Sequence, residues 1–143
     1  MSTLSTISGR EASMFAALCE AFVSPSDSMP PVRETDAAFA LDANLAVAPA
    51  LNRIGLRVGL YVLEIAPLLM GRGARLRRLD PAARADVITQ LKGSSALGQV
   101  LEAFRAIAHQ CYYGDLAVMR SFGYDPHAVT ERAAKLRVTE NRW

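Results

Sequence analysis

The segment LDPAARADVITQL, residues 79–91, indicates most directly how this chain folds. Asp80 is a favourable N-cap residue, and Pro81 suits the first position of a helix because an N–H there would have no intrahelical partner. Apolar residues then recur at helical spacing, at Val87, Ile88 and Leu91. We therefore predict a helix from residue 81 to about residue 92, with these three side chains turned inward.

Two further helices are predicted downstream of this segment. A Gly-Ser-Ser break at residues 93–95 interrupts the first pattern, and either serine can begin the next helix. Gly114 then turns the chain, Asp115 caps a short helix and Gly123 ends it. The longer of these two helices carries one broad apolar stripe, formed by Leu97, Val100, Leu101, Phe104, Ile107, Ala108 and Cys111.

The N-terminal part of the chain predicts two more helices. Ser8 and Glu11 fit a capping box at the start of the first, and the proline-rich segment SPSDSMPPVRE, residues 24–34, ends it. Thr35 or Asp36 can cap the second. Both carry apolar residues at helical spacing, namely Phe15, Leu18, Cys19 and Phe22 on the first and Phe39, Leu41 and Leu45 on the second.

A long third helix is predicted over residues 50–70, and the glycines that follow it are typical of a helix end. Arg57 and Glu64 interrupt its apolar run, which falls short of the roughly 20 apolar residues needed to cross a bilayer. We therefore expect a core or interface helix.

This third helix has one broad apolar face and two glycines. Gly55 and Gly59 are four residues apart, a spacing that suits the close approach of another helix, with simple tolerance of glycine as the alternative. The residues that form this broad face are Leu51, Ile54, Val58, Tyr61, Val62, Ile65 and Leu68 or Leu69.

The composition predicts one all-α domain. In a chain of 143 residues, 51% are hydrophobic and 21% charged, which excludes a disordered chain, and alanine and leucine outnumber β-branched residues. We expect a single-domain bundle of five to six helices spanning residues 1–143, with a core over about 8–126 and a polar tail over 127–143 that ends in Trp143. The net charge of +2 is too small to indicate a nucleic-acid partner.

The sequence argues against a self-sufficient enzyme and against a metal or cofactor site in this chain. It has only two histidines, His109 and His127, and the candidates near His109, Glu102 and Arg105, do not complete a set of metal ligands. His109 and Cys111 are two residues apart, so they do not face each other on a helix, and no phosphate-binding or nucleophile motif is present. We expect Cys19 and Cys111 to be buried thiols in a reducing compartment, and a disulfide between two helices is the alternative.

Two groups of residues are candidates for contact with a partner protein. Tyr112, Tyr113, Phe122 and Tyr124 gather near one end of the predicted bundle, where they either close its core or anchor a partner. Asp115 is expected to be a helix cap first and a partner contact second. The basic residues after the third helix either form solvated surface or steer an acidic partner; they are Arg72, Arg75, Arg77 and Arg78, and the last three are our candidates for a steering rim.

Four features resemble a known family. They are FAALCEAFVSP at residues 15–25, the proline-bearing loop after it, the LDPAAR helix start at 79–84, and the YYGD…GYDP segment at 112–126. In this order and spacing the chain resembles the gluconate 2-dehydrogenase subunit 3 family. It is also similar to the N-terminal extension of long-chain alcohol oxidases of the glucose-methanol-choline class.

The resemblance implies an all-helical accessory subunit. Such a subunit associates with a large FAD-bearing subunit that oxidises an alcohol, a sugar or a sterol-like substrate, and the flavin, the catalytic histidine and any haem belong to other chains. Its role is to help the large subunit fold, assemble or travel. The N-terminal sequence MSTLSTISGREASMF lacks the pattern of an export signal, so we expect a cytoplasmic complex or one at the inner surface of the membrane.

We therefore expect a non-catalytic small subunit that binds and stabilises a large FAD-dependent oxidoreductase subunit. One alternative is a bundle that binds a small apolar ligand, with the long third helix and five methionines lining a cavity. Another is a peripheral membrane anchor, with the arginines of residues 72–78 on anionic lipid. Membrane association is expected to be weak.

Overall fold

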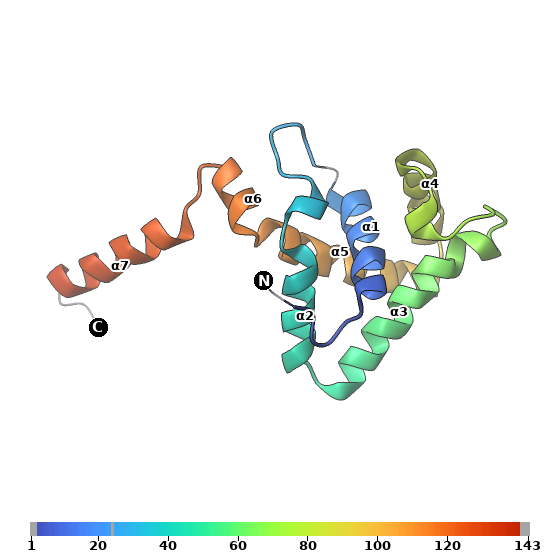
Figure 1. Ribbon diagram of the computed structural model, residues 1–143, viewed down its shortest axis with the longest axis horizontal. Coiled ribbons are helices and arrows are strands. Elements are labelled where there is room, and N and C mark those ends of the chain that lie inside the picture. Colours follow the sequence, from blue (N-terminus) through green and yellow to red (C-terminus); the bar gives the residue numbers. More distant parts are fainter. Residues whose placement is uncertain (1–2, 24, 141–143) are drawn as a thin grey trace.

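The computed structural model describes residues 3–23 and 25–140, and these residues have the all-α architecture predicted from the sequence (Figure 1). They form seven α-helices and two short 3-10 helices and contain no strand. This is more than the predicted five to six helices, because the tail is helical too; its Trp143 lies outside the described residues. The elements are α1 (Gly9–Val23), η1 (Val32–Glu34), α2 (Ala37–Val47), α3 (Ala50–Leu69), η2 (Leu76–Arg78), α4 (Pro81–Lys92), α5 (Ser95–Tyr113), α6 (Leu116–Ser121) and α7 (Pro126–Glu140).

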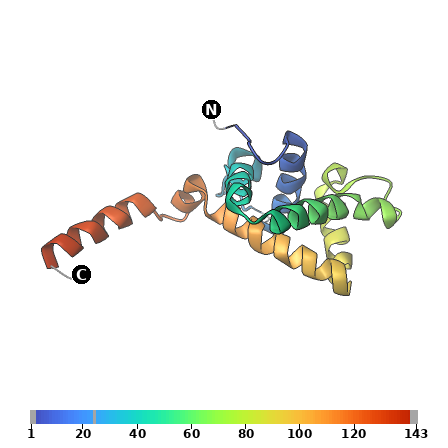
Figure 2. The ribbon, with the colours of Figure 1, turned by 90° about the horizontal axis from the view of Figure 1, so that it is seen from below.

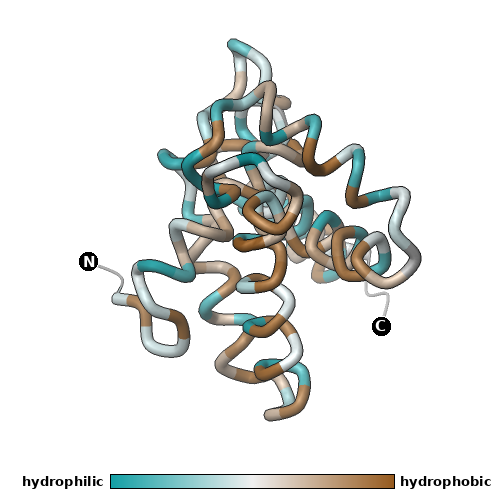
Figure 3. The backbone as a smooth tube through the Cα atoms, turned by 90° about the vertical axis from the view of Figure 1, so that its right-hand side faces the viewer, coloured by the Kyte–Doolittle hydropathy of each residue, from teal (hydrophilic) through white to brown (hydrophobic). Residues whose placement is uncertain are grey.

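Helix α5 is the centre of the bundle. Helices α1, α2, α3, α4 and α6 all pack against it, and Figure 2 shows it running along the body of the molecule. Figure 3 shows how hydrophobic and hydrophilic positions alternate along the backbone, which is what produces an apolar stripe on a helix. The predicted stripe of α5 is confirmed, because its residues Leu101, Phe104, Ala108 and Cys111 are all buried.

The helices begin at the predicted caps. Ser8 and Glu11 form the capping box of α1: the Ser8 N–H donates to Glu11 Oε2 at 2.8 Å, and the Glu11 N–H donates to Ser8 Oγ at 3.2 Å. At the start of α4, Asp80 accepts a hydrogen bond from the Ala83 N–H at 3.0 Å. The side-chain oxygens of Thr35, Ser94 and Asp115 likewise accept hydrogen bonds from backbone N–H groups at the starts of α2, α5 and α6.

Gly59 brings α3 and α5 close together. A Cβ at this position would lie 3.0 Å from Phe104 Cε2 and 3.1 Å from Val100 Cγ1. In the described part of the chain nothing lies within 4 Å of a Cβ built on Gly55. Gly59 therefore provides the predicted close approach, whereas Gly55 is merely tolerated.

Buried charged side chains hold the non-helical segments onto the helices. Asp42 of α2 is one of them: it accepts hydrogen bonds from the N–H groups of Ser5, Thr6 and Ile7 at 2.7–2.9 Å. Burial alone would raise the pKa of Asp42, but these bonds outweigh it and lower the pKa to about 2. The sequence patterns identified the buried Glu11 as a cap and missed the other three buried charges, Asp42, Glu64 and Arg84.

Arg84, the last residue of the LDPAAR segment, ties three parts of the fold together. Its Nε donates to Leu76 O at 3.3 Å and its Nη2 to Leu79 O at 3.0 Å, so it holds the loop between α3 and α4. Its Nη1 donates to Ala17 O of α1 at 3.3 Å and pairs with Glu20 at 3.0 Å. The planar fork of donors in a guanidinium suits this role, since several carbonyl groups are satisfied at once.

Helix α7 extends away from the body of the molecule (Figures 1 and 2). Its side chains over residues 127–139 are exposed. The chain leaves α6 at Gly123, whose φ of +75° suits glycine, and the N–H groups of Gly123 and Tyr124 donate to Arg120 O and Met119 O at 2.9 and 3.1 Å. This pairing ends α6, and α7 then begins a new direction.

We expect Asp42→Asn to destabilise the fold by about 2 kcal/mol at neutral pH, because a neutral amide replaces a buried charged acceptor. Since the pKa of Asp42 falls from 3.8 to about 2 on folding, its stabilisation is complete above pH 3.8 and is lost as the pH falls through about 2. Urea unfolding followed by circular dichroism should therefore show that the free energies of unfolding of the wild type and Asp42→Asn converge as the pH falls over that range. The exposed Asp27→Asn is the control, and a pH-independent difference for Asp42→Asn would contradict the assignment.

The two glycines of α3 provide a matched test of helix packing. We expect Gly59→Leu to destabilise the protein by about 1–3 kcal/mol, because the added side chain collides with Phe104 and Val100. Gly55→Leu should be neutral or stabilising by up to about 1 kcal/mol, since leucine favours a helix more than glycine does. Thermal unfolding of both variants measures the difference, and equal effects would show that α3 does not depend on this contact.

Candidate functional site

Three of the candidate contact residues form an exposed group at the end of α5 and α6, which we call the aromatic cluster: Tyr113, Phe122 and Tyr124. Their exposed fractions are 40%, 62% and 49%. The ring centroids of Tyr113 and Phe122 lie 6.2 Å apart. Gly114 makes the turn between the two helices, and a Cβ there would lie 2.6 Å from Gln110 O. Three rings with large apolar area and two hydroxyl groups are suited to contact with another protein.

Tyr112 was predicted as a contact residue, and the structure corrects this. It is fully buried, and its hydroxyl donates to Pro30 O in the proline-bearing loop at 2.7 Å. Burial raises the pKa of Tyr112, with a smaller contribution from the neighbouring Tyr113 and Asp115. Neighbouring positions on a helix point about 100° apart. Tyr112 therefore faces the core, while Tyr113 faces outward.

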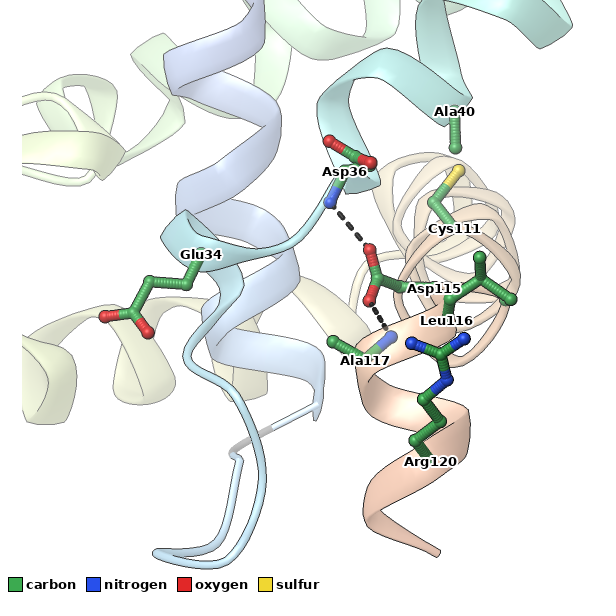
Figure 4. A pocket seen from close by; sticks show the side chains of 9 residues that line it. Glu34, Asp36, Ala40, Cys111, Asp115, Leu116, Ala117 and Arg120 are labelled. Carbon is green, nitrogen blue, oxygen red and sulfur yellow. Dashed lines mark hydrogen bonds between the residues drawn. The ribbon is translucent and has the colours of Figure 1, made fainter. Parts of the chain in front are cut away.

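Asp115 is the predicted helix cap, and it also links two helices. Its Oδ1 accepts the Ala117 N–H at 2.8 Å at the start of α6, and its Oδ2 accepts the Asp36 N–H at 2.8 Å before α2 (Figure 4). Asp36 and Asp115 line an open groove of about 470 Å³ with Glu34 and Arg120. Two of its lining residues, Gly114 and Asp115, directly follow Tyr113 in the sequence. The groove contains three acidic side chains and one basic side chain. A structural role as cap and link is therefore confirmed for Asp115.

The candidate arginines lie on a different side of the molecule from the aromatic cluster. The loop between α3 and α4, which carries them, and helix α6 are at opposite ends of the body (Figures 1 and 2). Arg77 is held inward: its Nε lies 3.0 Å from Glu64 Oε1, and its backbone N–H donates to Glu64 Oε2 at 3.2 Å. Arg78 is exposed and Arg75 is half-buried. The arginines proposed as a steering rim therefore do not adjoin the aromatic cluster.

The broad apolar face predicted for α3 is mostly exposed, so it faces away from the core. We call the exposed part the α3 face: Leu51, Ile54, Val58, Tyr61, Ile65, Leu68 and Leu69. Leu51 and Leu69, at its two ends, are 79% and 82% exposed. The buried side of α3 instead contains Gly59, which admits α5, and Glu64, which holds η2 through Arg77. A contiguous apolar stripe of this length on a surface indicates an interaction site.

The histidine and cysteine side chains take part in packing. His109 Nε2 lies 3.5 Å from Phe22 O, and its ring meets Tyr113 edge-on at 5.8 Å. Cys19 and Cys111 are both buried free thiols, and burial raises the pKa of both, that of Cys111 to about 11. Among residues 3–23 and 25–140 there is no group of three or more histidine, cysteine, aspartate or glutamate side chains that could hold a metal ion.

Within the described residues, every helix is either too short or too polar to span a bilayer.

The segments on which the family resemblance rests contact one another in the structure. Arg84 of the LDPAAR segment reaches Ala17 of α1, and Tyr112 of the YYGD segment reaches Pro30 of the proline-bearing loop. These residues therefore hold the helices and loops of the same core together. Comparisons with protein-family models, curated proteins and solved structures find no match to this chain.

We expect Tyr112→Phe to lower the free energy of unfolding by about 1 kcal/mol, because the Pro30 carbonyl loses its buried partner. Tyr113→Phe should leave stability within about 0.5 kcal/mol, since its ring is partly exposed. Denaturant unfolding of the two variants makes the comparison. Equal stability of both would show that the proline-bearing loop is not held by the Tyr112 hydroxyl.

Proposed function

We propose that this chain is a non-catalytic small subunit that binds and stabilises a large FAD-dependent oxidoreductase subunit of the glucose-methanol-choline type. The flavin and the catalytic residues belong to the large subunit. The sequence resemblance supports the kind of partner, and the aromatic cluster supports the mode of binding. The chain would cover an apolar patch on the large subunit that otherwise drives its aggregation.

The observation that carries the proposal is the exposure of Tyr113, Phe122 and Tyr124 on one short structural unit. Phe122 and Tyr124 lie at the C-terminal end of α6, where the N–H groups of both donate to Met119 O at 3.1 Å. Tyrosine is enriched at the points that contribute most to protein interfaces, because it loses little conformational entropy for its large contact area. The groove lined by Gly114 and Asp115, which directly follow Tyr113 in the chain, would supply polar groups for such a contact.

Helix α7 supports the same proposal. It has 15 residues and extends from the body beside the aromatic cluster. Isolated helices of this length are marginally stable in water, so a partner surface would add most of the stability. Val129 and Leu136 are exposed on it, two turns apart, and would face that partner.

The apolar recess between α1, α2, α3 and α5 does not favour the ligand-binding alternative. Ile7, Leu41, Leu60 and Phe104 are among its lining residues, and its volume is about 10 Å³. Sites for drug-sized ligands have volumes of about 300–1,000 Å³. This recess is therefore too small for such a ligand, and its apolar side chains contribute to the stability of the core.

The test is co-purification of the tagged full-length chain from its native host, followed by absorbance spectroscopy and identification of the bound chain. We expect a large flavoprotein in near-equal amount, with the yellow absorbance of oxidised flavin. A colourless chain recovered alone, under conditions in which the flavoprotein gene is expressed, would overturn the proposal.

We expect Tyr113→Ala combined with Tyr124→Ala to weaken binding of that flavoprotein at least about tenfold, because two anchoring side chains are lost. Titration of the purified large subunit measures the affinity, and circular dichroism checks that helix content is unchanged. Tyr61→Ala is the matched control, since Tyr61 is 38% exposed on α3. If the double variant binds as tightly as the control, the aromatic cluster is not the interface.

A further inference from the structure

The α3 face is a second apolar surface, separate from the aromatic cluster. Six of its seven residues, from Leu51 to Leu68, follow one another at three- and four-residue steps, Leu69 comes directly after them, and all seven are exposed. Helix α3 lies along the outside of the body in two perpendicular views (Figures 1 and 2). The face is therefore a straight apolar ridge with the length of the whole helix.

The charge of the chain is concentrated beside this ridge. Residues 50–79 contain six of the 16 basic residues and one of the 14 acidic residues, a net charge of +5, whereas the rest of the chain carries −3. The one acid, Glu64, is buried against Arg77. The apolar ridge and the loop that follows it are thus strongly basic in a chain whose total charge is only +2.

Arginines lie near both ends of the ridge. In its N-terminal half Arg57 pairs with Glu11 at 3.1 Å, and near its middle Arg10 of α1 lies over the Tyr61 ring at 5.7 Å. Beyond its C-terminal end Arg72 pairs with Asp86 at 2.9 Å, and Arg78 is exposed. Arg57 and Arg72 are therefore partly neutralised by these carboxylates, and the loop after α3 also contains Arg75 and Arg78.

We propose that α3 lies flat on a membrane surface that contains anionic phospholipid. The aliphatic side chains of the α3 face would enter the boundary between headgroups and acyl chains, and Arg75 and Arg78 of the loop after α3 would contact lipid phosphates. This inference does not depend on the proposed partner, because the aromatic cluster lies on another part of the molecule. The chain would thereby hold its partner at the membrane.

The chemistry of the ridge favours lipid over a second protein. Between Leu51 and Leu69 its exposed side chains are aliphatic except for Asn52, Arg57 and Tyr61. A protein interface usually contains about one hydrogen bond per 100–200 Å², which this surface has few groups to supply. A bilayer requires apolar area and positive charge, and both are present here.

The probe is the full-length chain mixed with vesicles of phosphatidylcholine that contain about one-third phosphatidylserine. We expect co-sedimentation with these vesicles that weakens as salt is added, and much less binding to vesicles of phosphatidylcholine alone. Absence of the chain from the anionic vesicle pellet at low salt would overturn the proposal.

Two pairs of substitutions locate the surface. Ile54→Ser with Val58→Ser should lower vesicle binding at least about tenfold, because it removes apolar area at the middle of the ridge. Arg75→Gln with Arg78→Gln should lower it about tenfold or more and flatten the salt dependence. The matched controls change exposed residues of α7, Ala134→Ser with Val138→Ser and Arg132→Gln with Arg137→Gln, and should leave binding within about threefold.

Partner binding by the same variants separates this inference from the proposed function. If Ile54→Ser with Val58→Ser keeps the flavoprotein and loses the vesicles, the α3 face is the lipid surface. If it loses the flavoprotein and the wild type does not bind vesicles, α3 belongs to the protein interface and the lipid proposal is wrong. Circular dichroism of each variant verifies that the helices are intact.

Discussion

The burial of the apolar stripe of α5 is the constraint on which the rest of the structure depends. Five helices of the body pack against this one helix, so each must turn its own complementary side toward it. Helix α3 meets it through Gly59, where the missing side chain admits Phe104 and Val100. Because that contact selects the side of α3 that is buried, it also selects the side that is exposed. The apolar α3 face is thus a consequence of how the core is packed.

Buried charges perform a second task, which apolar packing cannot perform. Asp42, Glu64 and Arg84 each lie on an α-helix and bond to the backbone of a segment between α-helices or before α1: Asp42 to residues 5–7, Glu64 to Arg77, and Arg84 to the carbonyl groups of Leu76 and Leu79. An irregular segment has backbone polar groups that need partners when it is covered. One charged side chain can supply several hydrogen-bond partners at once. Loss of such a side chain would leave buried backbone groups without a partner.

The aromatic cluster and the α3 face differ in the chemistry of their exposed side chains. The aromatic cluster presents rings and hydroxyl groups beside a groove that is more acidic than basic, which suits a protein partner with its own polar groups. The α3 face presents aliphatic side chains among arginines, which suits an anionic lipid surface. If both proposals hold, the chain is an adaptor, with a rigid bundle that sets the orientation of its partner relative to the membrane.

The sequence by itself determined the fold class, the helix ends and the stripe of α5, because caps, prolines, glycines and a single apolar stripe act within a few residues of the chain. Only the tertiary structure decided which side of α3 is buried, since Leu60 and Leu63 on one side compete with Ile54 and Val58 on the other, and the choice depends on α5 and η2. It likewise decided that Tyr112 faces the core while Tyr113 faces outward, and that Asp42 and Arg84 are buried. These outcomes depend on partners distant in sequence, such as Pro30 for Tyr112 and Ala17 for Arg84, and local periodicity contains no information about them.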